Sequence, residues 1–393
     1  MKIRRIQANT VKVGTRYELA GQSDATAQLP GSDYLRFPPY NQLYSQLSES
    51  MIVRIETDEG VVGWGEAQAP IGPEVAQAVV AKVVGPAVLG RDALATGVRF
   101  SEMYETLRVR GQVTGYQMDA IAAIDTALWD IKGKVLGRSI SDLLGGRFRD
   151  TLPSYITGLR AKTREARAEE AAGWVQAGHA GVKPCLGNGV RQDAAELEAV
   201  REAIGDDGEL MLDGVWQYSY PQAVQIGRVC EQLGVMFFES PLVPEDIDGH
   251  ARLAQELDVA IAVGEPLRTR YQFQPWFRAN AMDVVQPDLM RNGVSESAAI
   301  AAIAEAHNKP VALHTGTLTV IGMSGSWQVA STLPNFLIQE YQPVMIGAFN
   351  EWLRNPLEVR DGQLVVPTGP GLGLDIDEER FKRDVDASVT IEV

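Results

Sequence analysis

Three acidic residues follow short apolar stretches at an even interval: Asp213, Glu239 and Glu265 stand 26 residues apart. Each could separately be an ordinary turn, helix-cap or loop residue, because Asp-Gly, Glu-Ser and Glu-Pro pairs occur at such places. If the stretches are neighbouring strands, the three carboxylates face one space and repel one another unless a cation lies between them. An all-oxygen ligand set with room for water suits Mg²⁺. The spacing therefore predicts one Mg²⁺ per site, bound by these three residues.

A second pair of residues repeats the same interval. His314 lies 26 residues after Asp288, and it ends the apolar stretch "PVALHT". A histidine in that place is often only a buried structural residue. An aspartate on the preceding strand end would bond one ring nitrogen, fix the tautomer and raise the basicity of the other nitrogen. The pair therefore predicts a general base, His314, held by Asp288. The other histidines lie on expected helices or loops, and we interpret them as structural.

Two further strand ends carry charged residues, Lys183 and Glu340. Glu340 is either a protonated acid that donates a hydrogen bond to a substrate oxyanion or a partner in a salt bridge. Lys183 either binds a substrate carboxylate as a point charge or pairs with the acid cluster. The residue types leave both alternatives open.

The elements that would position these residues begin at about Thr151. Short apolar stretches there alternate with amphipathic, Ala- and Glu-rich stretches, and this alternation predicts βα units with a parallel sheet. The apolar stretches are "PSYITG", "AGVKPCL", "ELMLDG", "VMFFES", "VAIAVGE", "VVQPD", "PVALHT" and "NFLIQEY". Eight such strands at regular spacing indicate an α/β protein with a TIM-type barrel, in which chemistry occurs at the carboxyl ends of the strands.

The first third of the chain has a different pattern. Residues 51–67, "MIVRIETDEGVVGWGEA", alternate on both sides of Asp58-Glu-Gly60 and predict a β-hairpin. Helical stretches follow it. Residues 13–46 are rich in Gly, Pro and Tyr without a clear period, so they are either a lid or a disordered insertion.

The bulk composition excludes several classes of partner. The chain has 393 residues and a net charge of −15, which disfavours nucleic acid and anionic membranes. It contains no apolar run of the roughly 18 residues needed to span a bilayer. Two cysteines, Cys185 and Cys230, form no disulfide framework, and the N-terminal residues alternate like a strand. We therefore expect a cytoplasmic protein.

Taken together, these motifs resemble the mandelate racemase subgroup of the enolase superfamily over nearly the whole chain. Besides the strand-end residues and the hairpin, the resemblance rests on "DTALWDIKGK" (125–134), "ISDLLGG" (140–146) and "GPGLG" (369–373). It implies a modified (β/α)7β barrel at 131–365 and an α+β capping domain made of residues 1–130, with a lid near 13–46, and the C-terminal tail 366–393. It also implies an essential Mg²⁺.

The same resemblance implies abstraction of the proton α to a carboxylate, giving an enediolate that Mg²⁺ and Lys183 stabilise. The muconate cycloisomerase and dipeptide epimerase branches place a lysine base in the sixth strand, and "VVQPDLMRNG" (284–293) contains none. His314 with Asp288 therefore carries the base role.

The chain departs from this subgroup at two places. The second strand typically ends Lys-x-Lys, with the second lysine a base on the opposite face of the substrate, whereas this chain has Lys183-Pro-Cys185. The third strand often carries Asp-x-Asn, whereas this chain has Asp213-Gly-Val215 followed by Trp216. A thiol is mostly protonated at neutral pH, so Cys185 is expected to contact substrate and not to act as the base. Trp216 is either a platform for the substrate or a core residue, and we expect the platform.

The loss of the second base determines the predicted reaction. A racemase needs an acid and a base on opposite faces, whereas one histidine suffices for syn β-elimination, because it can return the α proton to the departing hydroxyl. We therefore expect an acid-sugar dehydratase that gives a 2-keto-3-deoxy acid. Alternatives are a sugar-acid lactone cycloisomerase, a racemase or epimerase, and a non-catalytic, metal-bound binding protein.

The substrate is expected to be a small anion, a sugar acid or its lactone. Tyr34 and Arg36 of the stretch "GSDYLRFPPYNQLY" are the predicted cap contacts, although Tyr40 and Tyr44 lie in the same stretch. A homo-oligomer is expected because most soluble oligomers are symmetric assemblies of one chain.

Overall fold

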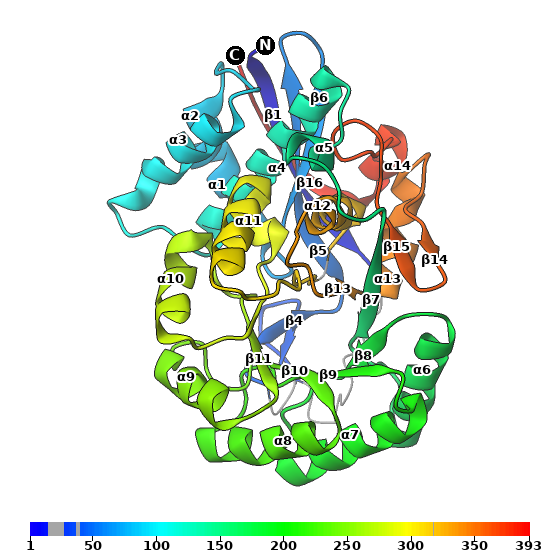
Figure 1. Cartoon of the computed structure of the whole chain (residues 1–393). Helices are drawn as coiled ribbons and strands as arrows, with labels where there is room; N and C mark the ends of the chain where they lie inside the picture. The colour runs from blue at the N-terminus through cyan, green and yellow to red at the C-terminus, as the bar shows by residue number, and fades with distance from the viewer. Residues whose placement is uncertain (15–26, 37–39, 317) are drawn as a thin grey trace.

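The computed structural model describes residues 1–14, 27–36, 40–316 and 318–393. It contains an antiparallel cap sheet with its helices and a parallel barrel (Figure 1). This arrangement confirms the predicted fold class, an α/β barrel with an α+β cap.

The cap sheet has four strands in the order β16-β1-β5-β6. They are β1 (Ile3–Val13), β5 (Ser48–Thr57), β6 (Val62–Ala67) and β16 (Val385–Glu392). The predicted hairpin is confirmed: β5 pairs antiparallel with β6, and Gly60 in the connection has φ of 82°. The last strand, β16, pairs with β1, so both chain termini lie at the same end of the molecule (Figure 1).

Cap helices cover one face of this sheet. They are α1 (Pro73–Val79), α2 (Gly85–Val88), α3 (Thr96–Arg108) and α4 (Tyr116–Leu136). The short helix α5 (Ile140–Leu143) follows and packs against α4. The helix α4 packs so closely on β6 that a Cβ at Gly65 would lie 1.9 Å from the carbonyl oxygen of Ala123. Only glycine allows this approach. The helix runs continuously across residue 130, where the sequence placed the end of the cap.

The stretch 13–46, predicted as a structureless lid or insertion, contains a small sheet. Its strands are β2 (Ala27–Gln28), β3 (Tyr34–Arg36) and β4 (Leu43–Ser45), paired antiparallel in that order. The strands are too short to leave an alternating pattern in the sequence. Residues 15–26 and 37–39 of the stretch lie outside the described part of the chain.

The barrel strands run in chain order and close when the last one pairs with the first. They are β7 (Thr151–Thr157), β8 (Gly181–Lys183), β9 (Glu209–Asp213), β10 (Val235–Glu239), β11 (Ala260–Val263), β12 (Val284–Val285) and β13 (Gln339–Tyr341). The strand β13 pairs parallel with β7.

The seventh predicted strand, residues 310–315, is wrong as a continuous strand. It joins its neighbours only through isolated bridges, in which Val311 pairs with Val285 and Phe336, and His314 pairs with Asp288. Pro287 and Pro310 carry no N–H group, so the ladder on this side lacks two donors. The segment nevertheless occupies the seventh strand position and places His314 beside Asp288.

A helix follows each of the first seven strand positions, which gives the (β/α)7β order. These helices are α6 (Arg164–Gln176), α7 (Val190–Ile204), α8 (Tyr220–Gln232), α9 (Ile247–Glu256), α10 (Thr269–Ala279), α11 (Leu289–Ala306) and α12 (Val320–Ser331). After β13 come α13 (Pro343–Phe349), β14 (Val359–Arg360), β15 (Gln363–Val365) and α14 (Glu378–Phe381). The strand β15 adds to β7 on the outside of the barrel path.

One layer of apolar side chains fills the barrel interior. Its buried members are Tyr155, Met211, Phe237, Ala262, Val284, Ala312 and Ile338. The ammonium of Lys183 lies 5.4 Å from the centre of the Tyr155 ring, so the polar end of the barrel begins directly beyond this layer. In the described ranges, no helix combines the length and apolarity that a membrane crossing requires.

Candidate active site

The strand register brings the first two carboxylates to one level. Asp213 is paired with Glu239 between the parallel strands β9 and β10, so the side chains lie next to each other at the carboxyl ends. Glu265 follows shortly after β11 ends at Val263. The expectation that these residues share one end of the barrel is therefore met by the geometry.

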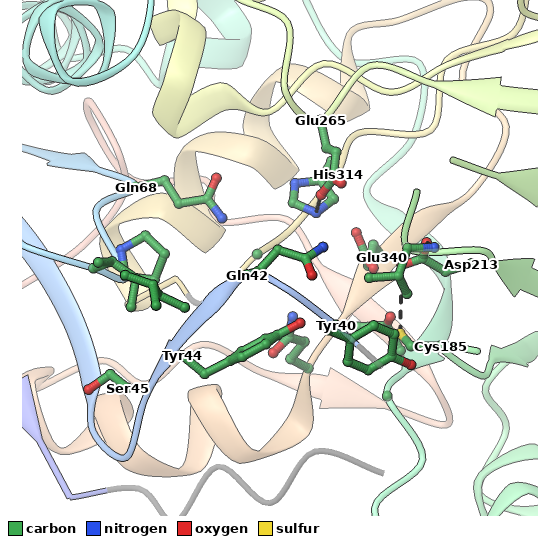
Figure 2. Close-up of a pocket in the computed structure, with 18 of the residues that line it drawn as sticks. Tyr40, Gln42, Tyr44, Ser45, Gln68, Cys185, Asp213, Glu265, His314 and Glu340 are labelled. Carbon is green, nitrogen blue, oxygen red and sulfur yellow. Dashed lines mark hydrogen bonds and ion pairs between the residues drawn. The ribbon is translucent and has the colours of Figure 1, made fainter. Parts of the chain in front are cut away.

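A cavity of about 340 Å³ opens at this end, between the barrel and the cap (Figure 2). Barrel residues in its wall include Cys185, Asp213, Glu265, His314 and Glu340. The cap contributes the opposite wall with Tyr40, Gln42, Leu43, Tyr44, Ser45, Leu47, Gln68, Pro70 and Ile71.

Lys183 is buried below the acid cluster and pairs with two of its carboxylates. Its Nζ lies 2.5 Å from Oε2 of Glu239 and 2.9 Å from Oε1 of Glu340. Burial lowers the pKa of Lys183, but the two carboxylates outweigh this and raise it well above its usual range. The structure thus shows the ion pair that was one of the two alternatives for this lysine. Lys183 is not among the residues that line the cavity.

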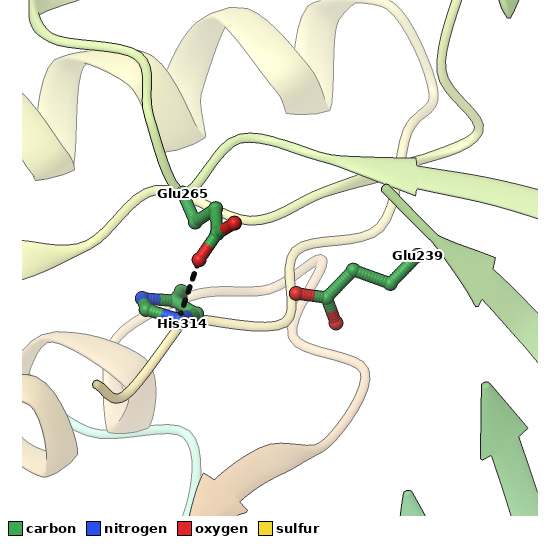
Figure 3. Close-up of side chains that lie close together, drawn as sticks. All are labelled: Glu239, Glu265 and His314. Carbon is green, nitrogen blue, oxygen red and sulfur yellow. Dashed lines mark ion pairs between the residues drawn. The ribbon is translucent and has the colours of Figure 1, made fainter. Parts of the chain in front are cut away.

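His314 is held between two carboxylates. Its Nδ1 lies 2.7 Å from Oδ2 of Asp288, and its Nε2 lies 3.1 Å from Oε2 of Glu265 (Figure 3). The other oxygen of Asp288 accepts the backbone N–H of Met290 in the first turn of α11. Burial lowers the pKa of His314, but Glu340 and the bonds to Asp288 and Glu265 raise it well above its usual range. Both ring nitrogens of the imidazole therefore face carboxylates.

Lys183 only partly offsets the negative charge around Asp213. Burial, and then the charge of Glu239, raise the pKa of Asp213 to about 8. Burial also raises the pKa of Glu239, although Lys183 opposes this. Glu265 differs: burial acts to raise its pKa, but the bond from His314 reverses the sign and lowers it. An additional cation would relieve the unneutralised charge, so the residues fit a divalent metal ion.

The ligand atoms that come closest together differ from the predicted trio. Those of Glu239, Glu265 and His314 lie within 4.8 Å of one another, and Asp213 is not in this group (Figure 3). Oδ1 of Asp213 accepts the N–H of Val215 at 2.8 Å, and Oδ2 lies 3.6 Å from the sulfur of Cys185. A carboxylate and histidine cluster that could hold a divalent ion is therefore present, with the histidine in the place of a third carboxylate.

Glu340 faces two donors, and its expected hydrogen bond to a substrate oxyanion stays a prediction. Its Oε2 accepts the N–H of Thr315 at 2.7 Å, and its Oε1 faces the ammonium of Lys183. Both partners are donors, and this arrangement suits an ionised carboxylate.

Cys185 lies in the cavity wall beside Asp213. Burial, and then the charge of Asp213, raise the pKa of its thiol well above the usual range. The thiol is therefore a neutral group at physiological pH, unable to act as a thiolate base.

Three predicted substrate contacts lie outside the described cavity lining. The hydroxyl of Tyr34 is 3.1 Å from Oε2 of Glu49 and accepts the N–H of Gly72 at 2.8 Å. Arg36 is exposed on β3. The indole N–H of Trp216 donates to Oε1 of Glu265 at 2.6 Å, so this ring contacts an acid of the cluster, and its expected contact with substrate stays a prediction.

Other cavity residues were not predicted as substrate contacts from the sequence. Gln42 and Gln68 extend from the cap into the space in front of His314 (Figure 2). Gln68 accepts a hydrogen bond from Nε of Arg291, whose Nη1 donates to the carbonyl of Glu265 at 2.9 Å. Arg160, which follows β7, also lines the cavity. Single glutamines and arginines have no characteristic spacing, so only the packing of the cap on the barrel identifies them.

Family models match two parts of the chain. The model described as mandelate racemase/muconate lactonizing enzyme, N-terminal domain, matches residues 44–145. The model described as enolase C-terminal domain-like matches residues 166–380.

Individual proteins are similar over most of their length. The D-galactarolactone cycloisomerase of Agrobacterium fabrum is 36% identical over 84% of this chain and 89% of its own. The arabinonate dehydratase of Saccharolobus solfataricus is 34% identical over 85% of this chain and 90% of its own. The crystal structure of the 3,6-anhydro-D-galactonate cycloisomerase of Zobellia galactanivorans superposes with a TM-score of 0.84, at 30% identity, over 98% of this chain and 100% of that one.

Proposed function

This chain belongs to the mandelate racemase/muconate lactonizing enzyme family of the enolase superfamily, and from that premise we propose that it is an acid-sugar dehydratase. It would eliminate water from a sugar acid and give a 2-keto-3-deoxy acid. The observation that carries the proposal is the His314–Asp288 pair, a single base that faces a carboxylate cluster. The neutral thiol of Cys185 stands where a second base would be needed for racemisation.

We further propose that the metal ion is Mg²⁺ and that Asp213, Glu239 and Glu265 hold it. The support is the all-oxygen donor set of these carboxylates, which suits a hard cation. Burial and then the charge of Glu239 raise the pKa of Asp213 to about 8, and a cation beside it would favour the ionised form. When bound, the ion would supply positive charge that neutralises these carboxylates and acidifies the α proton of a substrate carboxylate. The bound ion would also neutralise Glu265, which in the structure faces Nε2 of His314.

The proton chemistry then belongs to His314. Asp288 keeps the proton on Nδ1, so Nε2 is the atom that accepts the α proton as the C–H bond breaks. The same Nε2–H donates its proton to the β oxygen as the C–O bond breaks, and water leaves. Because one group performs both transfers, the α proton and the hydroxyl depart from the same face. The enol product becomes the 2-keto acid when its third carbon takes a proton.

Lys183 and Glu340 assist without exchanging a proton in this scheme. Lys183 adds positive charge below the cluster, and Glu340 fixes Lys183 and the N–H of Thr315. The cap closes the other side with Gln42, Tyr40 and Tyr44 (Figure 2). The amide of Gln42 would bind hydroxyls of a sugar acid, whereas the hydroxyl of Tyr40 already donates to the carbonyl of Leu186 at 3.1 Å.

A sugar-acid lactone cycloisomerase is the second candidate, favoured by the 36% identical relative of that name. It uses the same single-base elimination, with the ring oxygen of the lactone as the leaving group. Both reactions yield a 2-keto-3-deoxy product, but only dehydration releases water and only cycloisomerisation consumes a lactone. The cytoplasmic location and the homo-oligomeric state stay predictions of the sequence.

Proton NMR in D₂O tests the proposal. The Mg²⁺-loaded protein is incubated with separate pools of aldonates, aldarates and their lactones, and a 2-keto-3-deoxy product deuterated at the third carbon is expected from one pool. His314→Asn should reduce turnover by about 10²–10⁴-fold, whereas His307→Asn, at an exposed position that stacks on Phe277, should not. Full turnover by His314→Asn would refute the assigned base.

A further inference from the structure

The turn after β9 has a strained backbone. Val215 and Trp216 have φ of 48° and 60°, in the left-handed region, and neither is glycine. A β-branched residue in this region is a genuine outlier, and such a conformation persists only where surrounding contacts determine it. The relevant contacts are those that the turn makes with the acid cluster.

This turn bonds to all three carboxylate residues of the proposed metal site. The N–H of Val215 donates to Oδ1 of Asp213 at 2.8 Å. The N–H of Gly214 donates to the backbone carbonyl of Glu239 at 2.8 Å. The indole N–H of Trp216 donates to Oε1 of Glu265 at 2.6 Å. One short segment therefore links residues that come from three different strands.

The Trp216 ring has little freedom to move away from Glu265. Its backbone N–H donates to the carbonyl of Ser240 at 2.8 Å, and its ring centre lies 5.9 Å from that of His250. His250 is fully buried, bonds through Nδ1 to the carbonyl of Asp246 at 2.7 Å and packs on Trp276. The aromatic packing therefore fixes the direction of the indole N–H.

The chemistry of this donor suits a metal ligand. An indole is neutral and only donates, so it orients a carboxylate without cancelling the negative charge that attracts a cation. The indole N–H binds Oε1 of Glu265. The other oxygen, Oε2, faces His314 and is the one directed toward the acid cluster (Figure 3). An arginine or lysine in this place would compete with the cation for the same charge.

We propose that Trp216 is a positioning residue of the metal centre, which preorganises Glu265 for a divalent cation through its indole N–H. The proposal rests on the proposed metal site. It gives Trp216 a role in positioning Glu265, besides the substrate contact expected from the sequence. Hydrogen bonds to metal ligands typically change metal affinity by about 10–100-fold when they are removed.

The test is the dissociation constant of Mn²⁺, measured by electron paramagnetic resonance on the full chain, with Mg²⁺ as competitor. Trp216→Phe, which keeps an aromatic ring but lacks the N–H, should weaken Mn²⁺ binding by about 10–100-fold. Replacement of Trp216 by 3-benzothienylalanine, which keeps the bicyclic shape and removes the N–H, should weaken it similarly. The unfolding midpoint without metal is measured for each variant, so that a folding defect is recognised.

Trp352→Phe is the matched control, because the indole of Trp352 also donates to a carboxylate, Asp384, at 2.6 Å. That acid is not in the metal-capable cluster, so Mn²⁺ affinity should stay at the wild-type value. Unchanged affinity in both Trp216 variants would overturn the inference while the metal site stands. Weakening by phenylalanine but not by benzothienylalanine would also overturn it, because packing and not the N–H would be responsible. A wild-type protein that binds neither ion would overturn the proposed metal site itself.

Discussion

Glu66 is a fully buried carboxylate that joins the cap to the catalytic end of the barrel. It lies on β6, and each of its oxygens accepts two hydrogen bonds. Oε1 accepts the hydroxyl of Ser50 at 2.8 Å and the N–H of Thr319 at 2.9 Å. Oε2 accepts the hydroxyl of Thr319 at 2.6 Å and the N–H of Gly322 at 2.8 Å. The two N–H groups belong to Thr319, the N-cap of α12, and to Gly322 in its first turn; α12 is the helix that follows His314 in the chain.

Glu66→Gln should destabilise the protein whichever way the new amide is oriented. Each carboxylate oxygen faces one backbone N–H, so the amide NH₂ must point at one of them, and a backbone donor cannot reverse its polarity. A buried unsatisfied donor costs about 1–3 kcal/mol, and a hydrogen bond to a charged acceptor contributes about 1.5–3 kcal/mol. The free energy of unfolding should therefore fall by about 2–4 kcal/mol.

Glu49→Gln provides the matched control on β5. Glu49 is buried, but its side-chain bonds are to the hydroxyls of Ser45 and Tyr34. Hydroxyls can rotate and accept from an amide, so this change should cost less than about 1 kcal/mol. Urea unfolding followed by circular dichroism in the presence of EDTA gives both values. If the two variants lose equal stability, the assignment of unpaired backbone donors at Glu66 is refuted.

Three further outcomes are expected. Burial raises the pKa of Asp125 to about 7; the folded state therefore holds a proton that the unfolded state releases near pH 4, and the free energy of unfolding should fall between about pH 4 and 7. In Asp125→Asn the free energy of unfolding should fall less over this pH range. Urea unfolding midpoints of both proteins measure this, and an equal fall with pH would show that Asp125 does not have the raised pKa. Cys185→Ser should keep turnover within about tenfold of wild type, because a neutral thiol takes no proton; a larger loss in the NMR assay would indicate a proton transfer at Cys185. Mg²⁺ at about 100 times its Kd should raise the free energy of unfolding by about 2.7 kcal/mol, and the gain should disappear in Asp213→Asn; an equal gain in that variant would remove Asp213 from the ligand set.

The sequence carried enough information for the barrel and for most of the catalytic end. Apolar stretches that alternate with amphipathic ones require βα units, and in a parallel barrel every strand delivers its last residues to the same end. The even interval therefore predicted that Asp213, Glu239 and Glu265 share one end of the barrel, whereas the ligand atoms that lie closest together are those of Glu239, Glu265 and His314. The prediction that Asp288 and His314 lie side by side followed from the same periodicity and matches their bridge and hydrogen bond.

Contacts between distant segments depended on the tertiary structure. Gln68 reaches the cavity because β6, which it follows, lies against the start of α12. Trp216 meets Glu265 because a left-handed turn after β9 directs its indole toward the end of β11. The predicted contacts Tyr34 and Arg36 failed to reach the cavity because β3 directs them to Glu49 and to solvent. Periodicity along a chain determines which end of a strand a residue occupies. The partner of a side chain depends instead on how separate elements pack, and this packing decides which groups line the cavity.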